Sequence, residues 1–168
     1  LTDEEGTGFY VPVQAPAGDP LLPLETTLEA LRPLLASPQI QKQGHNIKYD
    51  LIVLDRCGVK MDHISFDTMI AEWLIDPSSQ SLGLKDLAWT RLHERMLPIT
   101  DLIGTGRQQI TMREVPVARA APYACADADM THRLGSILRS ELKEKALWSL
   151  FIEVEMPLVP VLAAMEQA

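Results

Sequence analysis

The chain has 168 residues, 46% of them hydrophobic and only 5% aromatic, which is enough for one domain with a core of aliphatic side chains. Its formal net charge of −8 argues against broad binding of DNA or anionic membranes through overall charge, but it is compatible with a nuclease whose acidic centre is masked by metal ions. The sequence shows no signal peptide and no apolar run near the ~20 residues of a membrane span. The two cysteines, Cys57 and Cys125, lack metal-type spacing, and we interpret them as reduced thiols.

The first part of the chain predicts strands that alternate with helices. Residues 8–13, GFYVPV, alternate in polarity and contain aromatic and β-branched side chains, which predicts a strand. After a loop rich in proline and glycine, leucines at helical spacing predict a helix over 24–35 with an irregular end at Pro33. Residues 39–46 predict a short strand that runs into a turn.

The alternation continues through the middle of the chain. Residues 46–59 predict a helix that stops at a glycine, and residues 64–77 predict a short strand followed by a helix. That helix begins near Thr68 and ends before Pro77. Residues 78–93 predict a loop and then a further helix.

The second half of the chain is predicted to be mostly helical. Residues 96–111 are irregular, whereas the chain from Pro116 onwards predicts helix almost to its end, with a bend near Pro157 and Pro160. Strands that alternate with helices indicate the α/β class, with a helix-rich C-terminal half. The predicted strands are too few for a stable sheet, so we expect further strands before Leu1 in a longer polypeptide.

Two pairs of polar residues stand four positions apart on predicted helices. Asn46 precedes Asp50 and Tyr123 precedes Asp127 by this spacing, so the members of each pair face the same way. If the pairs converge, the two carboxylates repel and require a proton or a cation between them. Mg²⁺ prefers carboxylate oxygens together with water and substrate phosphate. A tyrosine beside such a metal can orient a water for attack on phosphorus.

Four motifs along the chain, GHNIKYD, FDTMIAEWLID, LKDLAW and YACADADMT, resemble the 3′–5′ proofreading exonuclease domain of bacterial family A DNA polymerases, the DNA polymerase I family. The final residues, EVEMPLVPVLAAMEQA, resemble the segment that leads to the polymerase domain. The resemblance covers nearly the whole chain and implies an RNase H-like α/β exonuclease fold that is truncated at its N-terminus. It divides the chain into a partial exonuclease domain over 1–147 and a helical segment over 148–168.

The resemblance also implies roles for individual residues. Asp50 and Asp127 match ligands of two divalent metal ions, Mg²⁺ or Mn²⁺, and Tyr123 matches the tyrosine that positions the attacking water. Asn46 matches a residue near the terminal nucleotide, and His45 is a candidate to line the same cleft. The implied reaction is two-metal hydrolysis of the 3′-terminal nucleotide of single-stranded DNA, as proofreading in replication and repair. The implied partner is the polymerase domain of the same polypeptide. The implied location is the bacterial cytoplasm, with no association with a membrane.

The first motif of that family, Asp-x-Glu at the end of a buried strand, has no counterpart in the chain. Residues 3–5, DEE, fit its letters, but only two residues precede them and Gly6 follows, so we interpret them as an exposed turn. With part of the ligand set absent, we expect the chain by itself to be a poor exonuclease. Helix faces left uncovered by absent strands are expected to let the chain associate with another copy.

Two other functions are compatible with the sequence. One is a 3′–5′ exoribonuclease resembling ribonuclease D, and the other is a non-catalytic remnant that packs against a polymerase domain. The presence of Asp50, Tyr123 and Asp127 argues against the remnant.

Several further residues have structural interpretations. Asp67 is predicted to cap the helix that follows it, and Asp129 is predicted to be a hydrogen-bonding partner within the fold. Core packing, in preference to stacking on nucleobases, is predicted for all three tryptophans, Trp73, Trp89 and Trp148.

Overall fold

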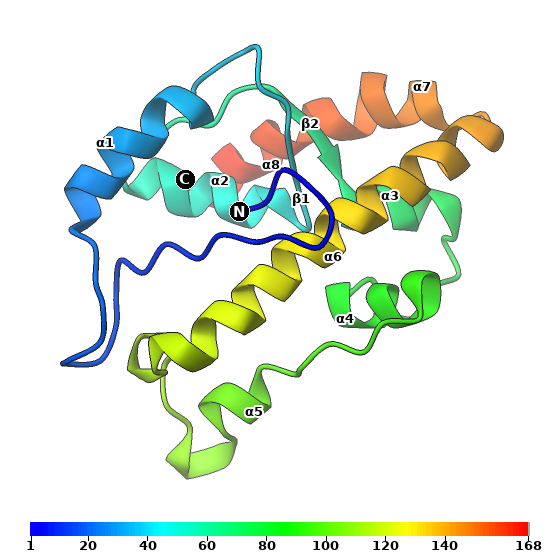
Figure 1. Cartoon of the computed structure of the whole chain (residues 1–168). Helices are drawn as coiled ribbons and strands as arrows, with labels where there is room; N and C mark the ends of the chain where they lie inside the picture. Colours follow the sequence, from blue (N-terminus) through cyan, green and yellow to red (C-terminus); the bar gives the residue numbers. More distant parts are fainter. Residues whose placement is uncertain (168) are drawn as a thin grey trace.

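The computed structural model describes residues 1–167, and helices make up most of it (Figure 1). The elements in chain order are α1 (Leu24–Leu35), β1 (Lys42–Gly44), α2 (Ile47–Arg56), β2 (Ile64–Asp67), α3 (Thr68–Ile75), α4 (Leu84–Leu87), η1 (Ala88–Leu92), α5 (Thr100–Ile103), η2 (Gly106–Gln108), η3 (Met112–Glu114), α6 (Val117–Glu144), α7 (Trp148–Leu150), η4 (Phe151–Glu155) and α8 (Met156–Gln167). Of the short η elements, η1 and η4 are π-helical and η2 and η3 are 3₁₀-helical. The predicted α/β class and the helix-rich C-terminal half are confirmed.

The two strands form a small parallel sheet. β1 pairs with β2 so that Gln43 lies opposite Phe66 and Gly44 lies opposite Asp67. α2 connects the two strands, which makes a β-α-β unit. Because the carboxyl ends of parallel strands share one edge of a sheet, the residues after Gly44 and the residues around Asp67 meet at the same edge.

The main core lies between the sheet, α3, α6 and the C-terminal helices. Phe66 of β2 is fully buried, and its ring centroid lies 4.8 Å from that of Phe151 and 6.5 Å from that of Trp148. α6 faces this core with leucines at every fourth position, Leu134, Leu138 and Leu142, all with no exposed surface. α6 therefore buries its C-terminal half, which leaves its N-terminal half to carry the polar pair predicted from the sequence.

A second, smaller core surrounds the first turns of α6. Leu102 of α5, Val115 and Ala120 are buried together, and Tyr10 and Tyr123 pack against them. The Tyr123 ring is thus fixed by apolar contacts on one side. This packing leaves its hydroxyl to make the polar contacts described below.

The N-terminal segment lies along α6, and the predicted strand over 8–13 is wrong, because the structure assigns no strand there. The backbone N–H of Gly6 donates to Oδ1 of Asp129 at 2.7 Å, and a Cβ added to Gly8 would stand 2.6 Å from Cβ of Cys125. Such a close approach to a helix replaces the strand partner that a β-ladder requires. The exposed turn at 3–5 and the structural role of Asp129 are both confirmed.

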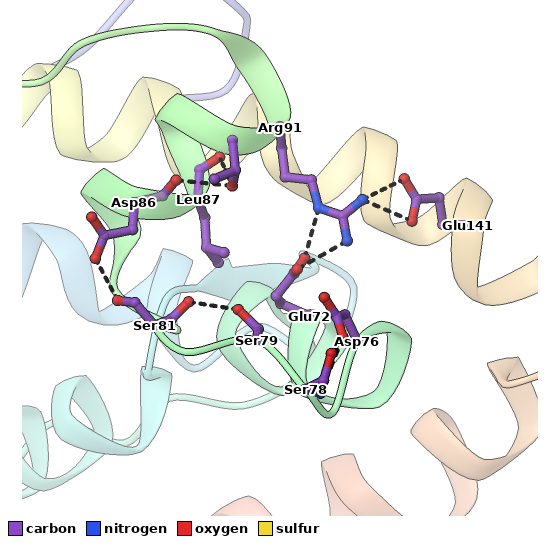
Figure 2. Close-up of polar contacts among 10 residues, drawn as sticks. Glu72, Asp76, Ser78, Ser79, Ser81, Asp86, Leu87, Arg91 and Glu141 are labelled. Carbon is purple, nitrogen blue, oxygen red and sulfur yellow. Dashed lines mark hydrogen bonds and ion pairs between the residues drawn. The ribbon is translucent and has the colours of Figure 1, made fainter.

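One arginine holds η1 against two longer helices. Figure 2 shows Arg91 between Glu72 of α3 and Glu141 of α6. Its Nε and Nη2 donate to the two carboxylate oxygens of Glu72 at 3.0 and 2.9 Å, and its Nη1 donates to those of Glu141 at 3.0 and 3.1 Å. Glu72 is only 3% exposed, so the two-pronged pairing satisfies a carboxylate that would otherwise be buried without a partner. The network fixes α4 and η1 relative to α6.

The prediction that the tryptophans pack in the core is wrong for two of the three. Trp148 contacts the main core, but Trp73 and Trp89 keep 47% and 48% of their surfaces exposed. In both helices smaller apolar residues, Ala71 and Ala88 among them, take the inward positions. The tryptophans therefore stand on the outer faces of these helices.

The C-terminal helix, Trp148–Gln167, is apolar on more than one side. Its length and its mean hydropathy of 1.5 would suffice to cross a membrane, whereas the sequence analysis expected no such run. Phe151, Met156 and Val159 bury one face of this helix in the main core. Its outer face exposes further apolar residues, including Leu158. α8 packs beside α2 (Figure 1), so this helix belongs to the described domain.

Candidate active site

The first cluster of site residues joins α6 to α4. The ε-ammonium of Lys85 lies 3.1 Å from the Tyr123 hydroxyl and 3.2 Å from Oδ1 of Asp127. The same nitrogen stands 4.4 Å from the centroid of the Tyr123 ring. Tyr123 and Asp127 thus share a face of α6, as their spacing predicts. Sequence reasoning missed Lys85 as a site residue, since a lysine on a short helix is exposed by default, although its motif LKDLAW carried part of the resemblance.

Burial and the lysine have opposite effects on Asp127. Burial raises the pKa of Asp127, and the charge and hydrogen bond of Lys85 oppose that rise without cancelling it. Burial lowers the pKa of Lys85, but the hydrogen bond with Tyr123 and the charge of Asp127 together carry that pKa above its usual value. Lys85 is therefore a cation within contact of Asp127.

A hollow of about 130 Å³ lies beside this cluster. Tyr123 and Asp127 line it together with Met96, Leu97 and Arg119. A larger hollow, of about 500 Å³, lies between the N-terminal segment and Arg113 and includes neither Tyr123 nor Asp127. We assign the site to the smaller hollow because the acidic and phenolic groups open onto it.

The second cluster centres on Asp67 at the carboxyl edge of the sheet. Asp67 is 1% exposed, and its carboxylate accepts the backbone N–H groups of Asn46 at 3.1 Å, Ile47 at 2.8 Å and Met69 at 2.8 Å. It therefore caps α3, as predicted, and also the start of α2. Asn46 adopts the left-handed conformation with φ of 57°, which turns the chain from β1 into α2.

Asp50 lies one turn into α2, close to Asp67. Burial, followed by the negative charge of Asp67, raises the pKa of Asp50 to about 6. By accessible surface, however, Asp50 is an exposed residue, so solvent screening reduces the energy that this shift represents. Within residues 1–167, no positively charged side chain contributes to this change in the pKa of Asp50. Asp50 thus carries an acid group whose charge the surrounding residues disfavour.

His45 stands between the two clusters. Its Nδ1 lies 2.9 Å from the Thr68 hydroxyl, and its Nε2 is buried without a partner among the described residues. Burial lowers the pKa of His45, while the charge of Asp67 and a backbone hydrogen bond with Leu82 raise it and the charge of Lys85 lowers it further. Because the charges of both Asp67 and Lys85 affect the pKa of His45, this residue lies near each cluster. β1 also contacts α6 directly, since Nε2 of Gln43 lies 3.0 Å from Nδ1 of His132.

The donor set suits a hard divalent cation but is incomplete. Carboxylate oxygens such as those of Asp50 and Asp127 are ligands that Mg²⁺ prefers, and burial of both favours a cation nearby. Residues 1–167, however, do not bring together three or more histidine, cysteine, aspartate or glutamate side chains that could hold a metal ion. These residues therefore do not form a complete metal centre, and a shared metal site for Asp50 and Asp127 stays a prediction.

Comparison with known proteins identifies the family. The family model described as 3′-5′ exonuclease matches residues 2–143. The DNA polymerase I of Chloroflexus aurantiacus is 44% identical over 163 residues, which cover 95% of this chain and 17% of the relative. The DNA polymerase I of Pseudomonas aeruginosa is 34% identical over 98% of this chain and 18% of the relative. The chain thus spans under one fifth of the length of these relatives.

Solved structures agree with the sequence comparison. A structure described as the POL domain of Pol1 from M. smegmatis, in complex with DNA primer-template and dNTP, superposes with a TM-score of 0.68 at 26% identity, over 88% of this chain and 22% of that one. Brucella melitensis NrnC with bound Mg²⁺ superposes with a TM-score of 0.63 at 19% identity, over 91% of this chain and 67% of that one, which supports the fold alone. The predicted RNase H-like exonuclease fold is confirmed. The chain belongs to the 3′–5′ exonuclease domain family of family A DNA polymerases.

Proposed function

We propose that this chain is the 3′–5′ exonuclease module of a bacterial DNA polymerase I, which removes the 3′-terminal nucleotide of single-stranded DNA as proofreading. The observation that carries the proposal is the cluster of Tyr123, Asp127 and Lys85 inside a region that the exonuclease family model matches. A phenol, a desolvated carboxylate and a cation meet there beside a hollow. Hydrolysis of a phosphodiester requires groups of these kinds to bind and orient the phosphate and the attacking water.

Each of the candidate catalytic residues has a proposed role in that reaction. Asp127 and Asp50 are proposed ligands of two divalent metal ions, Mg²⁺ or Mn²⁺, whose remaining ligands come from elsewhere in the complete polypeptide. When bound, such ions supply Lewis-acid chemistry to phosphoryl groups. The Tyr123 hydroxyl orients the attacking water, and its ring is already fixed by the smaller core. Of these groups, Tyr123 and Asp127 already lie together beside Lys85.

The terminal nucleotide is proposed to bind near the end of β1. Asn46 and His45 lie at the carboxyl edge of the sheet, where ligands of α/β folds commonly bind. The buried Nε2 of His45 has no hydrogen-bond partner of normal geometry among the described residues, although the backbone of Leu82 lies near enough to raise the pKa of the ring, and we propose that a nucleotide supplies the bond. A buried polar atom without a partner is costly, and a substrate contact would satisfy it.

The proposed partner is the polymerase domain of the same polypeptide, within the bacterial cytoplasm. The C-terminal helix exposes apolar side chains on its outer face, Leu150, Val154, Leu158, Val161 and Met165. An exposed apolar face of this extent is typical of a surface that another domain covers. By itself the chain is proposed to digest DNA poorly and to self-associate through such faces.

The test is digestion of 5′-labelled single-stranded DNA and RNA by the complete natural polypeptide with Mg²⁺. Asp127→Ala should lower the rate by more than about 100-fold, since even partners of metal ligands are worth about 10- to 100-fold, and it should leave thermal melting intact. Glu144→Ala, at an exposed acid near the end of the same helix, is the matched control and should digest normally. Undiminished digestion by Asp127→Ala would refute the site, faster digestion of RNA would favour the exoribonuclease, and an inactive wild type would favour the remnant.

A further inference from the structure

Trp89 stands on the exposed surface one helical turn from Lys85 of the candidate active site. It follows Lys85 by four positions along the continuous helix formed by α4 and η1, so the two side chains project from neighbouring turns of one face. Lys85 contacts Tyr123 and Asp127, whereas Trp89 is 48% exposed. Four residues of helix correspond to a rise of about 6 Å. Trp89 therefore lies about one helical turn from Lys85.

The surroundings of Trp89 are cationic and aromatic. The guanidinium of Arg95 lies 4.9 Å from the Trp89 ring centroid, and the imidazole of His93 meets the ring edge-on at 6.4 Å. The nearest acidic neighbour in sequence, Asp86, accepts a hydrogen bond from the Ser81 hydroxyl, and Glu94 is directed to Arg133 at 3.3 Å. Arg95 lies over the ring, and nearly half of the Trp89 surface remains exposed.

The same segment connects Trp89 to the hollow at the active site. Met96 and Leu97, which directly follow Arg95, line the hollow together with Tyr123 and Asp127. Arg91, two positions after Trp89, fixes the helix through Glu72 and Glu141 (Figure 2). Trp89 is thus an exposed ring on a helix that Arg91 holds in place, one turn from a lysine of the cluster.

We infer that Trp89, with Arg95 and His93, is a binding site on which a base of single-stranded DNA stacks while the 3′ end occupies the active site. This inference rests on the proposed nuclease function and adds a contact for the strand on the 5′ side of the terminal nucleotide. A chain with net charge −8 gains little from general attraction to phosphates. Stacking on an aromatic ring beside the guanidinium of Arg95 supplies affinity without sequence preference, because every base has a π-face.

Binding measurements on the complete natural polypeptide test the inference. The probe is a labelled oligothymidylate of about eight nucleotides, with EDTA present so that no hydrolysis occurs, and thymidine monophosphate serves as a ligand too short to reach Trp89. Trp89→Ala should weaken oligonucleotide binding about 5- to 150-fold, the range that stacking of one base corresponds to, and leave mononucleotide binding unchanged. Arg95→Ala should weaken it about 2- to 5-fold, as the loss of one cation over a ring predicts.

Trp73→Ala is the matched control, because Trp73 is another tryptophan with about half of its surface exposed, at 47%. It should bind the oligonucleotide like the wild type, and circular dichroism checks that each variant is folded. Photo-crosslinking of an oligonucleotide with 5-iododeoxyuridine on the 5′ side of its terminal residue should label Trp89, as mapped by mass spectrometry. Equal binding by Trp89→Ala and wild type, an equal loss in Trp73→Ala, or crosslinks that avoid Trp89 would overturn the inference.

The nuclease function is judged separately, by release of mononucleotides in Mg²⁺. If wild type digests DNA and Trp89→Ala binds it normally, the stacking site fails and the function stands. If wild type neither binds nor digests DNA, both fail. If Trp89 is protected from solvent in the free polypeptide, another protein surface covers it and the stacking site is refuted.

Discussion

Asp127 and Asp50 are both acids with raised pKa values, but their surroundings differ. Asp127 lies 3.2 Å from the ammonium of Lys85, so its negative charge has a cation at hand. Asp50 has Asp67 as its charged neighbour, and the negative charge of Asp67 adds to the effect of burial. The half of the candidate site around Asp127 therefore contains a positive charge, that of Lys85. In the described residues, the half around Asp50 instead brings two negative charges together, those of Asp50 and Asp67. The half built around Asp50 is the one that most requires a cation from solution.

The difference follows from the elements that carry the two acids. Asp127 sits in the middle of α6, opposite a short helix whose position Arg91 fixes. Asp50 sits near the start of α2, whose N-terminus is capped by a buried carboxylate. A carboxylate is favourable at a helix N-terminus, but two of them within one turn oppose each other. Asp67 thus fixes the chain turn at the sheet edge, and its repulsion of Asp50 lowers the stability of the fold. A residue that lowers stability in this way favours a functional reason for Asp50.

The largest expected effect comes from removing the shared cap of the Asp50 region. Asp67→Ala should lower the free energy of unfolding by about 2–4 kcal/mol, because it deletes the caps of two helices and leaves buried N–H groups unpaired. Urea denaturation of the chain measures this change. Asp62→Ala, an exposed aspartate before β2, is the control and should melt like the wild type. If both variants are equally stable, Asp67 is not the organising residue of this half.

A smaller effect, of opposite sign, is expected from Asp50 itself. The pKa of Asp50 is about 6 in the folded protein against an ordinary value of 3.8, so between these pH values the folded state binds more protons than the unfolded state. Stability should therefore fall as pH rises through this window. Asp50→Asn should remove that fall and stabilise the protein at pH 7 by about 1 kcal/mol, a figure reduced from the full shift because the residue is partly exposed.

Thermal melting of wild type and Asp50→Asn across pH 4–7 measures this contribution, with Asp62→Asn as the control. The difference between wild type and Asp50→Asn should grow with pH. A difference that stays constant across the window would show that Asp50 titrates as an ordinary exposed acid.

The smallest effect on stability is expected at the paired acid. Lys85 and Asp127 keep 30% and 33% of their side-chain surfaces exposed, so Lys85→Met should change the free energy of unfolding by only about 0–1 kcal/mol. It should nevertheless raise the pKa of Asp127 further, because the one charge that opposes the effect of burial is removed. Carbon-13 NMR titration of the Asp127 carboxyl measures that pKa, and Lys60→Met, at an exposed lysine, is the control. An unchanged pKa would contradict the pairing.

Local patterns predicted much of this structure. Leucine spacing identified α1, and the Asp67 cap identified the start of α3. Motif spacing put Tyr123 and Asp127 on one face of α6, because the helical repeat alone decides that. The structure of residues 8–13 could not be predicted, because a strand requires a pairing partner elsewhere in the chain. The segment packs along α6 instead. The exposure of Trp73 and Trp89 and the contact of Lys85 depend on which helix faces which, and this information is not local in the sequence.

The central claim is that Asp50 and Asp127 serve one metal site despite their different surroundings. Anomalous diffraction from crystals of the complete natural polypeptide soaked in Mn²⁺ tests it most directly. We expect two manganese peaks about 3.5–4 Å apart, with oxygens of Asp127 and Asp50 as ligands, directly or through one water. Peaks that involve neither residue, or carboxylates that bind ions on separate surfaces, would contradict it.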